Sequence, residues 1–340
     1  MKKRQTWILL LALVFILVGC GKKDSGEKIV IYTSMYEDIV DEIDKALEEK
    51  FPDIDVEFFS GGTGTLQAKI AAEVDSGQLG FDMLMVAEPS YALELMEDDL
   101  LHAYKIEDPE KLAFEYDEEG YWYPVRVLNM VLAYNPDKNA KDQVPNSFKD
   151  FAENSEFKDH VSMPNPLTSG SALASTSALR DKYGDEFFKS LGGQNAAVES
   201  GSVALTKLES GEADSIMILE ESVLKKREEE GSKLEVIYPE DGVISIVSPI
   251  MTAKEEVSAN KNVKAAEKLT DWFLSEEGQE YIVKGWMHSV LKDYDKVPFD
   301  SIPTKEITKG SMPIDWDKTY KEREEIRTMF QEHVTIEEEK

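Results

Sequence analysis

Three short segments of the chain combine glycine with serine or threonine directly before a predicted helix. They are residues 60–65 (SGGTGT), 168–171 (TSGS) and 200–203 (SGSV). Glycine allows a backbone to approach a ligand closely, and the unpaired N–H groups at a helix N-terminus favour an anion. Serine or threonine at this position is also a common helix cap. Each segment alone is equally well explained by capping, but three around one cleft would predict a site for a small oxyanion.

Acidic residues follow two of the predicted strands. Glu88 comes after residues 81–87 (FDMLMVA), and Glu220 and Glu221 come after residues 215–219 (SIMIL). A carboxylate there could accept charge-assisted hydrogen bonds from an ammonium or a hydroxyl group. The alternative is a solvated acidic helix start, which the helix dipole favours. Because neighbours on a strand point in opposite directions, Glu220 and Glu221 make a poor catalytic carboxylate pair.

The positions of these residues relative to the strands select the candidate site. In open α/β sheets, ligands bind at the carboxyl ends of strands, against the loops that lead into the next helix. Arg126 could hold an anion through two hydrogen bonds, although a pair with a carboxylate at the hinge is the favoured interpretation. The candidate ligand-binding residues are Ser34, Tyr36, Ser60, Gly62, Thr63, Gly64, Glu88, Thr168, Ser169, Gly170, Ser171, Ser202, Glu220 and Glu221.

The apolar periodicity that must position these residues alternates between strands and helices. This alternation is typical of an α/β fold with an open, mostly parallel sheet. Residues 125–134 and 243–252 are long apolar runs, and we expect them to cross between two lobes. The expected strands are residues 28–32, 54–59, 81–87, 160–163, 215–219 and 234–238; the expected helices are residues 38–50, 66–75, 172–182, 186–191, 203–210, 223–230, 264–273, 277–284 and 320–333, and a further helix is expected to start at residues 91–96.

The start of the chain has the features of a secretory signal peptide, namely a basic segment, an apolar run over residues 7–18 and small residues before Cys20. Cys20 is the only cysteine, so an intramolecular disulfide is excluded. The sequence Leu17-Val18-Gly19-Cys20 resembles a bacterial lipobox, which implies that Cys20 is lipidated and that residues 21–27 form a flexible tether. The formal net charge of −30 argues against a nucleic-acid partner.

Five stretches follow one another in an order that resembles one family. They are residues 29–34 (IVIYTS), 60–70 (SGGTGTLQAKI), 81–87, 134–136 (YNP) and 265–282 (AAEKLTDWFLSEEGQEYI). Together they resemble the extracellular solute-binding proteins of ABC importers, in the group that binds ferric iron, 2-aminoethylphosphonate, sugar phosphates or thiamine. The resemblance implies a two-lobed periplasmic-binding fold of type II, with open mixed sheets flanked by helices and a ligand cleft at the hinge. Lobe closure around the ligand is expected.

The resemblance also suggests the ligand and the partners. A phosphate or phosphonate group would fit the hydroxyl-rich segments, and 2-aminoethylphosphonate would place its amine near a glutamate. A sugar phosphate also fits, and thiamine would need an aromatic partner such as Tyr36, Tyr91, Tyr121, Trp122 or Tyr123. Polyamines remain a further alternative. We expect an ABC permease as the partner, a lipid anchor on the outer side of the cell membrane, a monomer and no cofactor.

Two other functions are disfavoured. Ferric-iron binders of this group generally use paired tyrosines after the strand of the second lobe, but the corresponding residues 219–222 read LEES. The four histidines are scattered, without the spacing of metal ligands. An enzyme is disfavoured because GxSxG, HExxH and P-loop motifs are not found. The expected organisation is a signal peptide (1–19), a lipidated tether (20–27), lobe one (28–128 plus 246–300), lobe two (129–245) and a C-terminal tail (301–340) assigned to neither lobe.

Overall fold

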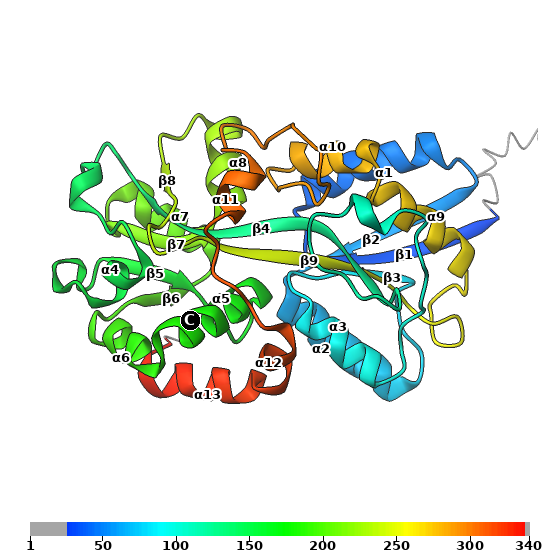
Figure 1. The fold of residues 1–340 in the computed structure, drawn as a ribbon, viewed down its shortest axis with the longest axis horizontal. Helices are drawn as coiled ribbons and strands as arrows, with labels where there is room; N and C mark the ends of the chain where they lie inside the picture. The colour runs from blue at the N-terminus through cyan, green and yellow to red at the C-terminus, as the bar shows by residue number, and fades with distance from the viewer. Residues whose placement is uncertain (1–25, 337–340) are drawn as a thin grey trace, which may run out of the picture.

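The computed structural model describes residues 26–336. The predicted signal peptide and Cys20 lie outside the described residues, as does the end of the C-terminal tail. The described chain forms two α/β lobes side by side along the long axis (Figure 1). Its strands form one sheet in the order β2-β1-β3-β9-β4-β7-β5-β6, with β8 paired to β4. The predicted α/β fold, with a mixed sheet flanked by helices, is confirmed.

Lobe one contains the N-terminal strands, in which β1 pairs in parallel with β2 and β3. The helix α1 covers this sheet because Ile39, Ile43 and Leu47 recur every four residues and bury one face. The helices α9 and α10 return to this lobe late in the chain (Figure 1). The elements are β1 (Glu27–Thr33), α1 (Glu37–Lys50), β2 (Ile54–Ser60), α2 (Thr63–Ser76), β3 (Met83–Met85), α3 (Ser90–Glu97), η1 (Pro109–Lys111), α9 (Val263–Phe273) and α10 (Glu276–Lys284).

Lobe two repeats the arrangement with its own strands. The strand β5 pairs in parallel with β6 and β7, and the helices between these strands carry the serine-rich starts noted in the sequence. The elements are η2 (Lys141–Gln143), α4 (Phe148–Glu153), η3 (Ser155–Phe157), β5 (Val161–Pro164), α5 (Gly170–Tyr183), α6 (Asp185–Gly193), β6 (Ala197–Glu199), α7 (Gly201–Ser210), β7 (Ser215–Leu219), α8 (Glu220–Glu230) and β8 (Glu235–Ile237).

Two long strands connect the lobes and join their sheets into one (Figure 1). They are β4 (Trp122–Tyr134) and β9 (Ile244–Thr252), which pair antiparallel to each other. Their ladder is irregular between Pro124 and Arg126, and Pro124 lies opposite Pro249. The expected crossings at residues 125–134 and 243–252 agree with these strands. The lobe boundaries after residues 128 and 245 fall inside the strands and stay predictions.

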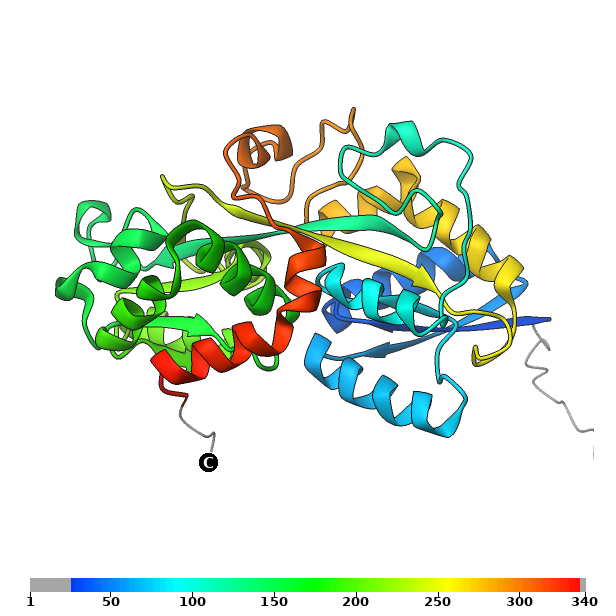
Figure 2. The same ribbon diagram turned by 60° about the horizontal axis from the view of Figure 1, so that its bottom comes forward.

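The C-terminal tail touches both lobes. It contains α11 (Thr304–Thr308), α12 (Trp316–Lys321) and α13 (Arg323–His333). The helix α12 packs against α3 of lobe one, whereas α13 packs against α5 and α6 of lobe two (Figure 2). Phe330 of α13 is fully buried and meets Phe188 edge to face, with ring centroids 5.9 Å apart. The tail is therefore a third connection between the lobes.

Several helices begin earlier than the sequence patterns predict. The segment at residues 60–64, expected to be a loop, instead ends β2 at Ser60 and starts α2 at Thr63. The residues Glu220 and Glu221, expected at the end of a strand, are the first two residues of α8. Carboxylates in a first helical turn interact favourably with the helix dipole, which explains this start. Within residues 26–336, no helix is both long and apolar enough to span a bilayer.

Candidate functional site

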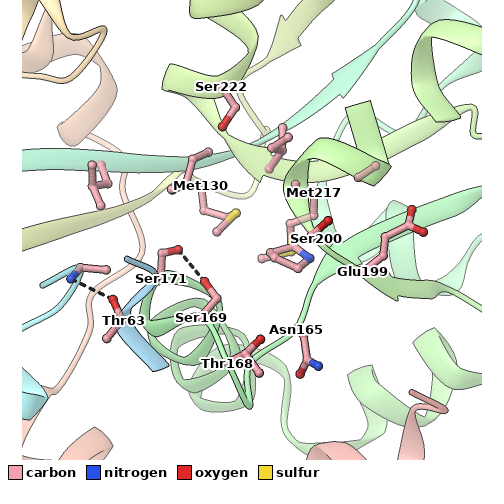
Figure 3. A pocket seen from close by; sticks show the side chains of 18 of the residues that line it. Thr63, Met130, Asn165, Thr168, Ser169, Ser171, Glu199, Ser200, Met217 and Ser222 are labelled. Atoms are coloured by element: carbon pink, nitrogen blue, oxygen red, sulfur yellow. Dashed lines mark hydrogen bonds between the residues drawn. The ribbon is translucent and has the colours of Figure 1, made fainter. Parts of the chain in front are cut away.

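A cavity of about 600 Å³ lies between the lobes, where the carboxyl ends of strands from both sheets meet. Figure 3 shows side chains from both lobes around this space. Its wall includes the first residues of four helices: α2 from lobe one, and α5, α7 and α8 from lobe two. The lining residues are Ser34, Tyr36, Gly62, Thr63, Ala87, Leu128, Met130, Pro164, Asn165, Thr168, Ser169, Ser171, Val198, Glu199, Ser200, Gly201, Ala204, Met217, Ile218, Leu219, Glu221, Ser222 and Ile336.

The start of α2 brings a buried hydroxyl to the cavity. Thr63 is only 3% exposed, and its Oγ1 accepts a hydrogen bond from the backbone N–H of Ala87 at 3.3 Å (Figure 3). Because this oxygen already accepts from the protein, its hydrogen is available to a ligand. Gly62 also lines the cavity, but Ser60 at the end of β2 and Gly64 inside the helix do not.

The start of α5 faces α2 across the gap between the lobes. Ser169 caps the helix by accepting from the N–H of Ala172 at 3.3 Å, and its Oγ lies 3.1 Å from the Oγ of Ser171. The lobes touch here, since the N–H of Gly64 donates to the carbonyl of Thr168 at 3.0 Å. Gly170 packs against Thr63 and lies outside the cavity wall. The absence of a side chain at Gly64 and Gly170 therefore permits this approach.

The third serine-rich segment reaches the cavity through different residues than expected. Ser200 and Gly201 at the start of α7 line the space, whereas the candidate Ser202 is exposed and lies outside it. The Oγ atoms of Ser200 and Ser202 are 3.2 Å apart. Ser200 is the residue before the helix, and Ser202 lies one residue inside it. Ser200 lines the cavity in place of Ser202 because α7 begins earlier than the sequence pattern predicts.

The two neighbouring glutamates of α8 have different roles. Glu221 lines the cavity, is 7% exposed and accepts no hydrogen bond from any residue of the described chain. Burial raises its pKa to about 7; Arg126 opposes this shift and Glu220 adds to it. Glu220 points away from the cavity and is almost fully buried. The sequence expectation that their side chains diverge is correct, although they lie on a helix.

Glu220 belongs to a hydrogen-bond network at the hinge. Its two carboxylate oxygens accept from Asn129 at 2.9 Å, His288 at 3.0 Å, Tyr238 at 2.6 Å and Ser301 at 2.5 Å. Burial alone would raise the pKa of Glu220, but the hydrogen bonds from His288, Ser301 and Tyr238 hold it below its usual value. These partners come from β4, from the residue that follows β8 and from the segment after α10, so this glutamate connects the parts of the hinge.

Arg126 lies behind the cavity wall. It is 1% exposed, and it donates to the Oγ of Ser248 at 2.9 Å, the Oγ of Ser34 at 2.8 Å and the sulfur of Met287 at 3.1 Å. The favoured expectation, an ion pair with a hinge carboxylate, is wrong, because among the described residues the hydrogen-bond partners of Arg126 are two hydroxyls and a sulfur, and Glu221 acts on it only through its charge. Ser34 lines the cavity and accepts from Arg126, so the hydroxyl hydrogen of Ser34 is available to a ligand.

Tyr36 connects the two lobes at the edge of the cavity. Its hydroxyl lies 2.6 Å from the Oγ of Ser222 in α8. Burial and the charge of Glu221 raise the pKa of Tyr36, so the phenol stays neutral. The candidate Glu88 lies elsewhere, fully buried at the start of α3, where its Oε2 accepts from the N–H of Ser90 at 2.7 Å. Burial raises the pKa of Glu88, and it does not line the cavity.

Eight of the fourteen candidates line this cavity, and six do not. Ser60, Gly64, Glu88, Gly170, Ser202 and Glu220 lie outside its wall. Sequence reasoning missed the apolar wall, in which Met130 and Met217 come from adjacent strands (Figure 3). Both residues stand in long apolar runs, and nothing in such a run distinguishes a cavity-facing side chain from a core one. It also missed Asn165 and Ile336.

The thiamine alternative relied on five aromatic residues, of which the structure places one at the cavity. Tyr36 lines it, whereas Tyr91, Tyr121, Trp122 and Tyr123 do not. Tyr91, Trp122 and Tyr123 are buried side chains of the cores. Within residues 26–336, no group of three or more histidine, cysteine, aspartate or glutamate side chains is arranged as a metal site.

Comparisons with known proteins agree with this architecture. The structure is similar to AfuA of Actinobacillus pleuropneumoniae with bound fructose-6-phosphate (TM-score 0.78, 19% identity, covering 92% of this chain and 99% of that one). It is also similar to iron-bound HitA of Pseudomonas aeruginosa (TM-score 0.77, 21% identity, covering 90% and 99%). A protein of Haemophilus influenzae described as uncharacterized is 24% identical over 278 residues, which is 78% of each chain.

The family comparison covers most of the chain. Residues 80–322 match the family described as bacterial extracellular solute-binding protein. The matched segment includes β4 and β9, all of lobe two and most of the C-terminal tail. The chain therefore belongs to the bacterial extracellular solute-binding protein family and is the solute-binding component of an ABC importer.

Proposed function

We propose that this protein captures a small phosphate- or phosphonate-bearing solute in the cavity between its lobes and delivers it to an ABC permease. The supporting observation is the meeting of four helix N-termini at one cavity, those of α2, α5, α7 and α8. Helix N-termini combine free N–H donors with a positive dipole end, which together favour an oxyanion.

The hydroxyl groups at the cavity support the same class of ligand. Ser34, Thr63 and Ser169 each accept a hydrogen bond from the protein, from Arg126, Ala87 and Ala172 respectively. The hydroxyl hydrogens of Ser34 and Thr63 donate to no other described residue, and the Ser169–Ser171 pair leaves at least one hydroxyl hydrogen to donate to a ligand. A ligand that only accepts hydrogen bonds, such as a phosphonate or phosphate group, uses such donors fully. The preferred ligand is 2-aminoethylphosphonate, and a sugar phosphate is the main alternative.

The experiment is a panel of small ligands tested by thermal shift and by isothermal titration calorimetry on the purified protein. The panel contains 2-aminoethylphosphonate, inorganic phosphate, hexose phosphates, thiamine species, polyamines and ferric citrate. A ligand that binds the folded state raises its apparent stability by mass action. Selective stabilisation by a phosphonate or phosphate ester is the expected result, whereas selective stabilisation by ferric citrate would overturn the proposed ligand class.

A matched pair of serine variants locates the binding. Ser169→Ala removes a hydroxyl that lines the cavity, and Ser202→Ala removes one outside it at a comparable helix start. Loss of a hydrogen bond to a charged group costs about 1.5–3 kcal/mol. We expect S169A to weaken binding of the phosphorylated ligand by at least about tenfold and S202A to leave it unchanged. Equal affinities for both variants would remove the α5 start from the site.

We further propose that Cys20 carries a lipid that holds the protein at the outer face of the cell membrane. The basis is the signal-peptide pattern and the lipobox-like sequence. Cys20→Ala should release the protein from the membrane fraction. A C20A protein that stays membrane-bound would contradict this anchor.

A further inference from the structure

The carboxylate of Glu221 has no hydrogen-bond donor among the described residues. It lies in the cavity wall at 7% exposure and accepts no hydrogen bond there. Its neighbour Glu220 is buried even more deeply, at 1% exposure, but receives hydrogen bonds from four side chains. A largely buried carboxylate without a hydrogen-bond donor is costly, and the charge of Arg126 offsets only part of that cost. A ligand bound in the cavity can supply the missing partner of Glu221.

The protein offers no free cation to Glu221. Among the described residues that line the cavity there is no lysine, arginine or histidine. The positive charge of Arg126 acts on Glu221, but Arg126 is buried behind the wall and already donates to Ser34, Ser248 and Met287. The remaining titratable groups that act on Glu221 or respond to it are Glu220 and Tyr36, and neither is a cation.

The surroundings of Glu221 strengthen its attraction to a positive charge on a ligand. Leu128, Met130, Met217 and Leu219 line the same cavity; they come from the paired strands β4 and β7, and β7 leads directly into α8. Apolar walls exclude water and lower the local dielectric constant, which strengthens the attraction between opposite charges. A positively charged group placed here would therefore interact more strongly with Glu221 than it would at the protein surface.

We propose that Glu221 selects a zwitterionic ligand, whose ammonium group pairs with this carboxylate while its oxyanion lies at the helix N-termini and hydroxyls. This inference rests on the proposed function and narrows it, because it disfavours simple phosphate esters without a cation. It also assigns the selection to Glu221 and gives Glu220 a structural role at the hinge.

Binding of such a ligand would be coupled to a proton. Burial raises the pKa of Glu221 to about 7, so near neutral pH the free protein holds a fraction of a proton there. An ammonium group beside the carboxylate favours its charged form and lowers this pKa. The protein should therefore release a proton when the ligand binds near pH 7, and its affinity should fall as the pH drops below 7.

The test compares two probes that differ only in the amine, 2-aminoethylphosphonate and ethylphosphonate. Calorimetry is performed on the wild-type protein, on Glu221→Gln and on Glu229→Gln, a control on the exposed part of the same helix. The wild type and E229Q should prefer the amino ligand by at least tenfold, and E221Q should lose this preference while retaining ethylphosphonate binding. Because the phosphonate also titrates near neutral pH, titrations in buffers of different ionisation enthalpy should show more proton release for the wild type than for E221Q.

The outcomes separate this inference from the proposed function. If both phosphonates bind the wild type equally, or if E221Q keeps the preference, Glu221 does not select a cation although the oxyanion site stands. Proton uptake on binding would also overturn the inference, because it would mean that a protonated Glu221 donates to the oxyanion. If neither phosphonate binds, the inference and the preference for 2-aminoethylphosphonate are both wrong, and the hexose phosphates of the ligand panel then test the proposed oxyanion class.

Discussion

Glu220→Gln tests whether the hinge depends on a buried charge. The carboxylate is 1% exposed and accepts from Asn129, His288, Tyr238 and Ser301 over distances of 2.5–3.0 Å. Glutamine has nearly the same shape, but its amide nitrogen cannot accept a hydrogen bond. The substitution leaves two of the four donors facing an N–H group and removes the charge that faces His288.

The expected loss follows from this geometry. Each lost hydrogen bond to a charged group costs about 1.5–3 kcal/mol, and the remaining amide oxygen keeps part of the network. We therefore expect E220Q to lower the free energy of unfolding at pH 7 by about 3 kcal/mol. The pKa of Glu220 in the folded protein lies below its ordinary value of 4.5. This contribution is therefore complete above the unfolded-state pKa and is lost as the pH falls through the lower folded-state pKa.

Urea denaturation of the wild type, E220Q and E229Q at pH 7 and at a series of pH values below 4.5 measures both effects. The difference between the wild type and E220Q should shrink as the pH falls, while E229Q should follow the wild type throughout. Equal stability of E220Q and the wild type at pH 7 would refute the reasoning. So would a difference that stays constant down to the pH at which the wild type unfolds.

Three further substitutions test the cavity and the tail. Thr63→Val removes the buried hydroxyl at the start of α2 and should weaken binding of the anionic ligand by about 1–3 kcal/mol in calorimetry; unchanged affinity would exclude Thr63 from the site. Gly64→Ala places a Cβ 2.6 Å from the carbonyl oxygen of Thr168, so it should hinder lobe closure and lower ligand affinity, whereas Gly193→Ala, with open space at its Cβ, should not. Equal affinities for these two variants would show that the lobes do not approach there. Phe330→Ala removes a fully buried ring between α13 and lobe two and should destabilise the protein by about 3–5 kcal/mol in urea; a loss below about 1 kcal/mol would mean that α13 is only loosely attached.

The fold could be predicted well where periodicity is strong. In α1, Ile39, Ile43 and Leu47 mark the buried face, and the predicted helix at residues 38–50 differs from the observed one by a single residue. The positions of β4 and β9 also followed from their long apolar runs. The placement of the tail could not be predicted, because α12 and α13 carry apolar residues that would fit either lobe.

The sequence predicted which kinds of residue form the site, but not which individual residues face the cavity. Hydroxyls and glycines before helices identified the right segments, because helix starts at strand ends point into the cleft. Which serine of a segment faces the cavity depends on where the helix begins, and an error of two residues at α7 exchanged Ser200 for Ser202. For the same reason the sequence could not show which of Glu220 and Glu221 faces the cavity, because one step along a helix turns a side chain by about 100°.

The pairing of Pro124 with Pro249 has a mechanical consequence for the motion between the lobes. Neither proline has an N–H group, so neither can donate a cross-strand hydrogen bond at this step of the ribbon formed by β4 and β9. We therefore expect the ribbon to twist more easily beside the prolines than elsewhere. Arg126, the next paired residue, holds Ser34 of the cavity. Flexing of the ribbon would thus be transmitted directly to a hydroxyl that faces the solute.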